Sequence, residues 1–266
     1  MTKDRFDRAR RALCWLATAA SAVLASTCPV LAQPAETIGR VKASVVAVGT
    51  VQKLRSPQFQ FRGTGFAVGD GTLIATNAHV IATPLAEGSD PEQLAVAIPS
   101  ADPQRAQVRV VQRAAMDAER DLALLRLPGQ PLPALPVRDS RAAREGDQFF
   151  FTGFPIGSVL GLFAVTHRAM IAAITPIAIP PGDTRKLDAS LLRRLKTGAF
   201  PVFQLDATSY PGNSGSPLYD PASGAVVGVL NMVFVKGTKE NALTNPSGIS
   251  YAIPAEHLQA LIESAR

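Results

Sequence analysis

The segment Pro211-Gly212-Asn213-Ser214-Gly215-Ser216-Pro217 places one serine between two glycines, directly before a short apolar run. A serine hydroxyl is a poor nucleophile at neutral pH unless a neighbouring base removes its proton. Glycines beside such a serine let the backbone turn so that N–H groups converge on one point. The segment alone is also typical of an ordinary turn, so its interpretation depends on the rest of the chain.

Two earlier segments supply the residue types that a nucleophilic serine requires. Thr76-Asn77-Ala78-His79-Val80 carries a histidine at the end of an expected strand, and Asp121 opens another expected strand 42 residues later. Histidine can accept the serine proton near neutral pH. A carboxylate on its other ring nitrogen fixes the tautomer and stabilises the imidazolium. Each residue alone has a common structural explanation, but together His79, Asp121 and Ser214 predict a catalytic triad.

The same segment provides the expected oxyanion hole. Attack of a serine on a carbonyl creates an oxyanion, which needs hydrogen-bond donors that are already in place. We expect the oxyanion hole to consist of Gly212, Asn213 and Ser214, with the backbone N–H groups of Gly212 and Ser214 as its donors.

These segments resemble those of the trypsin-like serine peptidases, which fold into two six-stranded β-barrels. More narrowly, the chain resembles the bacterial HtrA-type peptidases over roughly residues 40 to 262. The further stretches that carry this resemblance are Gly63-Thr64-Gly65-Phe66, Gly153-Phe154-Pro155-Ile156-Gly157, Asp206-Ala207, Val226-Val227-Gly228-Val229 and Ile249-Ser250-Tyr251-Ala252-Ile253-Pro254. The resemblance implies a serine endopeptidase that hydrolyses unfolded or damaged extracytoplasmic proteins through an acyl-enzyme. That family usually carries C-terminal PDZ domains, and this sequence shows none.

The resemblance also places a substrate pocket. Its base lies six residues before the serine, at Thr208, and its wall comes from Leu230, Asn231 and Met232. None of these residues is acidic, so a basic P1 residue has no partner there. A small or medium apolar P1 residue is therefore favoured.

Short apolar segments between turn residues predict an all-β fold with antiparallel strands. The expected strands are Val45–Val48, Gly65–Val68, Leu73–Ala75, Leu94–Ile98, Val108–Val111, Leu122–Leu125, Phe149–Phe151, Phe163–Val165, Met170–Ile174, Phe200–Leu205, Pro217–Tyr219, Ala225–Val235 and Ile249–Ile253. The Pro-rich stretch Pro128–Pro136 predicts a linker between two barrels, at about 40–130 and about 145–254. Apolar residues at i, i+3 and i+4 predict a terminal helix over 255–266.

Residues 1–32 have the layout of a secretory signal peptide. A basic start is followed by an apolar run from Ala12 to about Leu31 and a small-x-small ending at Ala32. We expect cleavage after Ala32, leaving a peptidase domain at 33–266 that is periplasmic or secreted and has no stable membrane insertion. An uncleaved membrane anchor is the alternative. A twin-arginine signal at Arg10-Arg11 and lipidation at Cys28 are weaker refinements.

The composition is that of a globular protein, with 47% hydrophobic and 18% charged residues. Both cysteines, Cys14 and Cys28, lie in the leader, which excludes disulfides and cysteine-ligated metals from residues 33–266. The leader also carries half of the formal charge of +6, so the basic pI is no argument for nucleic-acid binding. We expect polypeptide partners, no nucleic acid, no cofactor and no metal. The oligomeric state is not indicated.

Two other functions fit parts of the pattern. A binding or chaperone-like protein on a latent protease fold would differ only in a misformed oxyanion loop, which the sequence does not show. An esterase or acyl transferase could use the same serine. Its usual Gly-x-Ser-x-Gly elbow between a strand and a helix is missing, because the residues after Ser214 are expected to form a strand.

Overall fold

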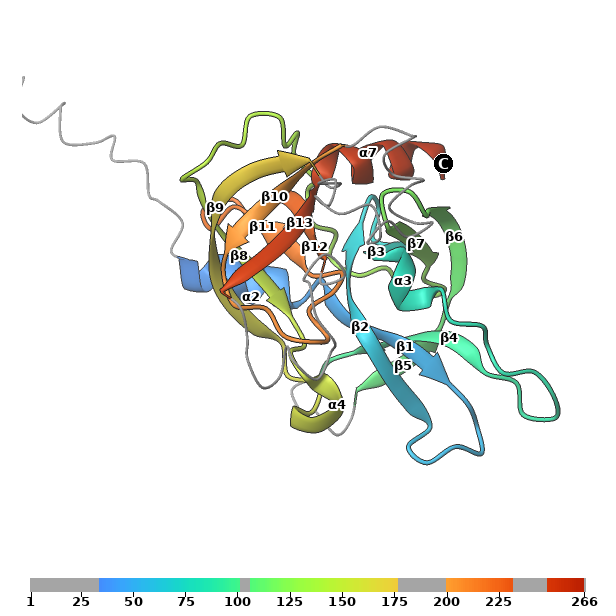
Figure 1. The fold of residues 1–266 in the computed structure, drawn as a ribbon. Helices are drawn as coiled ribbons and strands as arrows, with labels where there is room; N and C mark the ends of the chain where they lie inside the picture. Colours follow the sequence, from blue (N-terminus) through green and yellow to red (C-terminus); the bar gives the residue numbers. More distant parts are fainter. Residues whose placement is uncertain (1–33, 101–105, 177–199, 232–247, 266) are drawn as a thin grey trace, which may run out of the picture. The chain divides into compact units, whose positions relative to one another are not determined.

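The computed structural model describes residues 34–100, 106–176, 200–231 and 248–265 (Figure 1). The expected leader at 1–32 and Met232 of the expected pocket lie outside these residues. Strands make up most of the described elements, together with the helices α2 (Pro34–Lys42), α3 (Ala78–Ile81), α4 (Gly157–Leu160) and α7 (Ala255–Ser264).

The first half of the fold is a seven-stranded antiparallel sheet with the order β5-β4-β1-β2-β3-β7-β6. Its strands are β1 (Val45–Val51), β2 (Phe59–Val68), β3 (Leu73–Thr76), β4 (Gln93–Ile98), β5 (Gln107–Val110), β6 (Gln112–Asp117) and β7 (Leu122–Arg126). The two end strands, β5 and β6, are separated in the chain only by Val111. The predicted strand Val108–Val111 is longer in the structure, where it continues beyond Val111 as β6. The two parts are separate strands because the chain changes its pairing partner at Val111, from β4 to β7.

The second half is a closed six-stranded barrel with the order β10-β13-β12-β11-β8-β9. Its strands are β8 (Gln148–Gly153), β9 (Val165–Pro176), β10 (Pro201–Asp206), β11 (Pro217–Tyr219), β12 (Val226–Asn231) and β13 (Ile249–Pro254). The predicted all-β class is confirmed. Two segments were predicted as separate strands, but one strand forms because no turn residue interrupts the chain between Val165 and Met170. Met170–Ile174 lies within the long strand β9, and of Phe163–Val165 only Val165 belongs to it, as its first residue.

Strands beside the nucleophile and its partners are buried on both faces. In β1, Val46 and Val48 belong to one apolar cluster, whereas Val45 and Ala47 belong to another. The second cluster also holds Tyr219 from the closed barrel, so it joins the two halves. Because successive side chains of a strand point to opposite faces, burial of both faces produces the continuous apolar runs seen in the sequence.

Two further segments connect the halves. In the Pro-rich linker, the Leu135 N–H donates to Ala67 O at 2.9 Å, and Pro136 O accepts from the Val226 N–H at 2.8 Å. Helix α7 buries the apolar face predicted for it in the same shared cluster, through Leu258 and Leu261. Within the described ranges, no helix is both long enough and apolar enough to cross a membrane.

Candidate active site

His79 lies in α3, the single helical turn that follows β3, and faces Asp121 at the start of β7. Its ring Nδ1 is 2.6 Å from Asp121 Oδ2, and its backbone N–H donates to Oδ1 at 2.7 Å. A carboxylate only accepts hydrogen bonds, so Nδ1 carries the proton in this contact. The structure thus brings together the predicted base and its carboxylate, with 32% of the histidine side chain and 12% of the aspartate side chain exposed.

Three further groups hold Asp121, which has a left-handed backbone with φ +53°. Its carbonyl accepts from Asn77 Nδ2 at 3.0 Å and from the Ala78 N–H at 3.1 Å. Its Oδ2 accepts from Asn231 Nδ2 at 2.7 Å. Sequence reasoning missed the role of Asn77 and expected Asn231 only in the pocket wall. The position of Asn77, close to the predicted histidine, is a signal that could have predicted this role, since an asparagine side chain often hydrogen-bonds to backbone groups of a turn.

Ser214 lies just before β11 and is 6% exposed. Its carbonyl accepts from the Thr64 N–H at 2.8 Å, which ties the nucleophile segment to β2. A Cβ added to Gly63 would lie 2.8 Å from Val80 and 3.1 Å from Ser214 O, so the histidine helix and the serine segment meet across this glycine. In the described part of the chain, Ser214 Oγ makes no hydrogen bond to His79.

The residues Tyr210–Asn213 form a turn that we call the oxyanion turn. The Asn213 N–H donates to Tyr210 O at 3.0 Å, and Gly212 has φ +102°. Proline at the second position and glycine at the third are typical of a type II turn. A Cβ on Gly212 would lie 2.3 Å from Phe154 O, so this position also has no room for a side chain.

The two central carbonyls of the oxyanion turn accept hydrogen bonds from other segments of the chain. Pro211 O accepts from the Ile156 N–H, and Gly212 O accepts from Thr64 Oγ1, each at 2.7 Å. In a trans peptide the N–H points away from the C=O, so the Gly212 N–H points away from Ile156. Among the described residues, neither Gly212 N nor Ser214 N has a hydrogen-bond acceptor.

Asn213, the middle residue of the expected oxyanion hole, differs from its neighbours. The Asn213 N–H is occupied within the turn, which leaves Gly212 and Ser214 as available donors. The Asn213 side chain is fully buried, and its amide has no partner in the described chain. Ser216 Oγ is likewise buried without a partner there.

The segment behind the oxyanion turn is strained. Ile156 has φ +49°, a conformation that β-branched residues rarely adopt. Such a residue costs about 1–3 kcal/mol and persists only where its surroundings fix it. Phe61 and Phe154 pack edge to face beside Gly212, with ring centroids 6.2 Å apart. The strained residue, Ile156, is therefore the one whose N–H binds Pro211 O and so orients the Gly212 N–H.

Of the expected pocket residues, Leu230 is fully buried in the core of the closed barrel and Thr208 is half-buried. Asn231 contacts Asp121, as described above. In the ranges that the structure describes, no group of three His, Cys, Asp or Glu side chains could hold a metal ion.

Comparison with known proteins agrees with this geometry. The model of the trypsin-like peptidase domain matches residues 63–229, more than half of the chain. The chain therefore belongs to the trypsin-like peptidase family.

Its relatives are of the HtrA type, as the sequence motifs predicted. The mitochondrial serine protease HTRA2 of Bos taurus is 31% identical over 201 residues, covering 75% of this chain and 35% of the relative. A probable periplasmic DegP-like serine endoprotease of Pseudomonas putida is 28% identical over 206 residues, covering 76% and 34%. The chain thus spans about a third of the length of these relatives.

A solved structure, the HtrA-type protease AlgW with a tripeptide, has the same fold. It superposes with a TM-score of 0.60 at 23% identity, covering 87% of this chain and 63% of that one. The predicted trypsin-like fold is confirmed.

Proposed function

We propose that this chain is a serine endopeptidase of the HtrA/DegP type, with Ser214 as nucleophile, His79 as general base and Asp121 as the residue that orients His79. The observation that carries the proposal is the oxyanion turn, which leaves the N–H groups of Gly212 and Ser214 without acceptors beside the serine. Two converging donors next to a nucleophile are what the developing oxyanion requires.

The proposed reaction uses the two ring nitrogens of His79 differently. Because Nδ1 donates to Asp121, Nε2 is left to take the Ser214 proton as Oγ attacks the peptide carbonyl. The carbonyl oxygen becomes an oxyanion, held by Gly212 N–H and Ser214 N–H. When the intermediate collapses, the peptide C–N bond breaks, the amine leaves with the proton from Nε2, and an acyl-enzyme remains. Water then attacks the ester, and His79 again transfers the proton.

The substrate class is part of the proposal. Thr208 and Leu230 contribute no acidic group, which supports a small or medium apolar P1 residue. Relatives named periplasmic endoproteases support unfolded or damaged extracytoplasmic proteins as substrates. The signal-peptide layout of residues 1–32 supports export to the periplasm or the medium, with 33–266 as the mature domain. Sequencing the N-terminus of the exported protein tests this proposal, and a first residue of Gln33 would support it.

The test compares the full chain with its Ser214→Ala variant on unfolded casein at neutral pH. Cleavage by the unchanged chain and none by the variant is the expected result, and the cleavage sites then report the P1 preference. Covalent labelling of Ser214 by a fluorophosphonate gives a second readout that needs no substrate. If neither cleavage nor labelling occurs, the peptidase proposal fails.

One observation favours a second function. Ser214 Oγ makes no hydrogen bond to His79 in the described chain, as expected of a latent protease fold that binds unfolded chains without cutting them. However, hydrogen bonds between a nucleophile and its base often form fully only when substrate is bound. Binding of casein by both proteins without cleavage would favour this alternative.

A further inference from the structure

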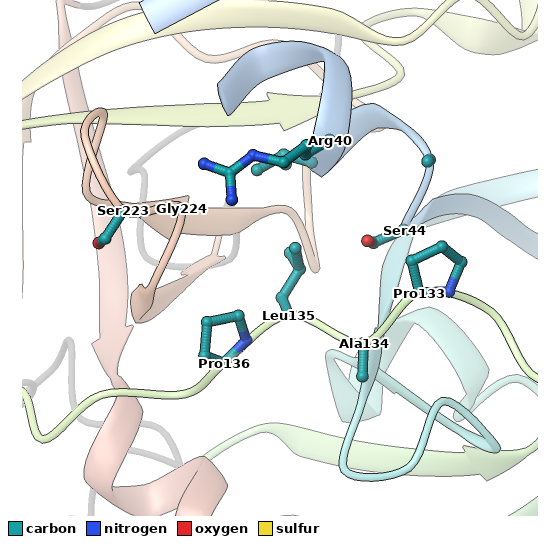
Figure 2. A pocket seen from close by; sticks show the side chains of 10 residues that line it. Arg40, Ser44, Pro133, Ala134, Leu135, Pro136, Ser223 and Gly224 are labelled. Atoms are coloured by element: carbon teal, nitrogen blue, oxygen red, sulfur yellow. The ribbon is translucent and has the colours of Figure 1, made fainter. Parts of the chain in front are cut away.

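A cavity of about 300 Å³ lies among three segments that carry none of the proposed catalytic residues (Figure 2). Its walls come from α2 with the residues that follow it, from the Pro-rich linker, and from the turn between β11 and β12. The volume is at the lower end of the range for small-molecule sites. The cavity therefore fits a ligand about as large as one amino acid with a short extension.

Most of the cavity wall is apolar. Leu135, Val41 and three small or cyclic residues of the linker, Pro133, Ala134 and Pro136, line it. Leu135 and Val41 are themselves buried in the core, so this wall is fixed by the fold. A ligand would gain affinity by removing apolar surface from water here.

One polar group in the wall lacks a partner. Ser44 is 1% exposed, and its Oγ makes no hydrogen bond within the described chain. Its backbone is fully used, since the N–H donates to Val41 O and the carbonyl accepts from the Ala67 N–H. Buried hydroxyls in folded proteins normally have a partner, but this one has almost no solvent-accessible surface and so adds no donor to the cavity.

A cation lies across the cavity from this hydroxyl. Figure 2 shows Arg40 and the Ser44 hydroxyl on different sides of Leu135. The Arg40 guanidinium donates to Thr37 Oγ1 at 3.1 Å, and no carboxylate of the described chain lies within 4.0 Å of it. No acidic residue lines the cavity. A guanidinium with unused N–H groups matches a carboxylate in both charge and geometry.

We propose that this cavity binds a small carboxylate with an apolar body. Arg40 donates to the carboxylate, and the apolar body packs on Leu135 and Val41. This chemistry is shared by the C-terminal residue of a polypeptide and by a free short-chain acid. The ligand would contact α2, the linker between the halves and the turn after β11 together, so it stabilises the folded chain by mass action. The proposal does not depend on peptidase activity.

Binding is measured on the full chain carrying Ser214→Ala, so that cleavage does not interfere. The probe is N-acetyl-leucine, and its uncharged control is N-acetyl-leucinamide. For so small a ligand a dissociation constant of about 1 mM is expected by calorimetry, with a rise in melting temperature. The amide should bind at least about tenfold more weakly, because it lacks the charge that Arg40 receives.

Two arginine variants test the assigned residue. Arg40→Gln should weaken N-acetyl-leucine binding about tenfold and leave binding of the amide unchanged. Arg113→Gln, which changes an exposed arginine of β6, should alter neither. Unchanged binding of N-acetyl-leucine to the Arg40→Gln variant would overturn the assignment of Arg40.

Two further probes distinguish the sources of the carboxylate. Acetyl-Ala-Ala-Leu with a free C-terminus represents a polypeptide end, and hexanoate represents a free acid. Stronger binding of either one supports the proposal and identifies the source. Equal affinity for N-acetyl-leucine and its amide, or no binding of any probe up to about 10 mM, would overturn it.

Discussion

The two sides of the active site are held in different ways. On the first side, every oxygen of Asp121 is engaged, by His79, Asn77, Ala78 and Asn231. On the second side, the two central carbonyls of the oxyanion turn depend on hydrogen bonds from distant segments, from Ile156 N–H and Thr64 Oγ1.

The polar groups behind these two sides differ in how many lack a partner. On the first side one buried atom, Asn77 Oδ1, has no partner in the described chain. The amide of Asn213 and the hydroxyl of Ser216 are buried beneath the oxyanion turn without partners in the described chain, and Ile156 is strained. A buried polar network specifies one geometry less strictly when more of its groups lack partners. We therefore expect the His79–Asp121 pair to be rigid, and the position of the oxyanion donors to be the adjustable part of the site.

The largest effect should come from the rigid side. Asp121→Asn keeps the size of the side chain and suits a left-handed backbone, so the fold should persist. The new amide can donate to Nδ1 and so places the ring proton on Nε2, which then has no lone pair for the Ser214 proton. We expect kcat to fall about 10,000-fold, as in other enzymes with this triad. Casein cleavage rates alongside circular dichroism measure this, and a loss below about 100-fold in a folded variant would remove Asp121 from the mechanism.

A smaller loss is expected from the adjustable side. In Gly212→Ala the new Cβ would meet Phe154 O and the Phe61 ring, so the turn must change and one oxyanion donor is lost. We expect kcat to fall about 100- to 1,000-fold with little change in KM. Gly129→Ala is the matched control, because Gly129 also has a positive φ but has open space around it. Equal losses in both variants would mean that backbone strain, and not the oxyanion turn, is responsible.

Thr64 tests how the oxyanion turn is oriented without touching the substrate. Its hydroxyl donates to Gly212 O and accepts from the Phe154 N–H at 3.1 Å. Thr64→Val removes both bonds while keeping the shape, and should lower kcat about tenfold with a normal KM. Thr64→Ser keeps the hydroxyl and should restore most of the rate. If Ser and Val behave alike, Thr64 acts through packing alone.

Much of this fold and site could be predicted from sequence because the signals are local. Alternating and continuous apolar runs predicted the strands, and the conjunction of three short motifs predicted which residues meet. The structure places His79 Nδ1 2.6 Å from Asp121 Oδ2. The assignment of catalytic roles, including that of Ser214, stays a prediction until activity is measured.

The rest depended on contacts between distant segments. Ile156 binds Pro211 O across 55 residues of chain, and Asn231 reaches Asp121 across 110. Neither contact leaves a pattern in either segment, since a backbone N–H carries no sequence signal and an asparagine fits many turns. The change of partner at Val111 was missed for the same reason, because an apolar run does not record which strand it pairs with.

The smallest effect on activity should come from Glu92, which lies directly before β4 and contacts Arg55 in the hairpin between β1 and β2. Glu92 accepts hydrogen bonds from Thr50 Oγ1 and from Arg55, and these lower the pKa of its carboxyl to about 2. A depressed pKa means that the ionised form stabilises the fold above pH about 4.5, and that this contribution is lost as the pH falls toward 2.

Glu92→Gln should therefore be less stable than the unchanged chain by about 2 kcal/mol at pH 7, measured by urea unfolding of both proteins. The difference should shrink steadily as the pH falls from 4.5 toward 2, because the carboxyl of the unfolded chain is protonated over this range while that of the folded chain is still ionised. At pH 7 the kcat of the variant should stay within about twofold of that of the unchanged chain, since Glu92 is not among the residues that bind Asp121. A stability difference that is independent of pH would show that shape, and not charge, makes Glu92 stabilising. A large fall in kcat would show that the rigid side of the site extends to this hairpin.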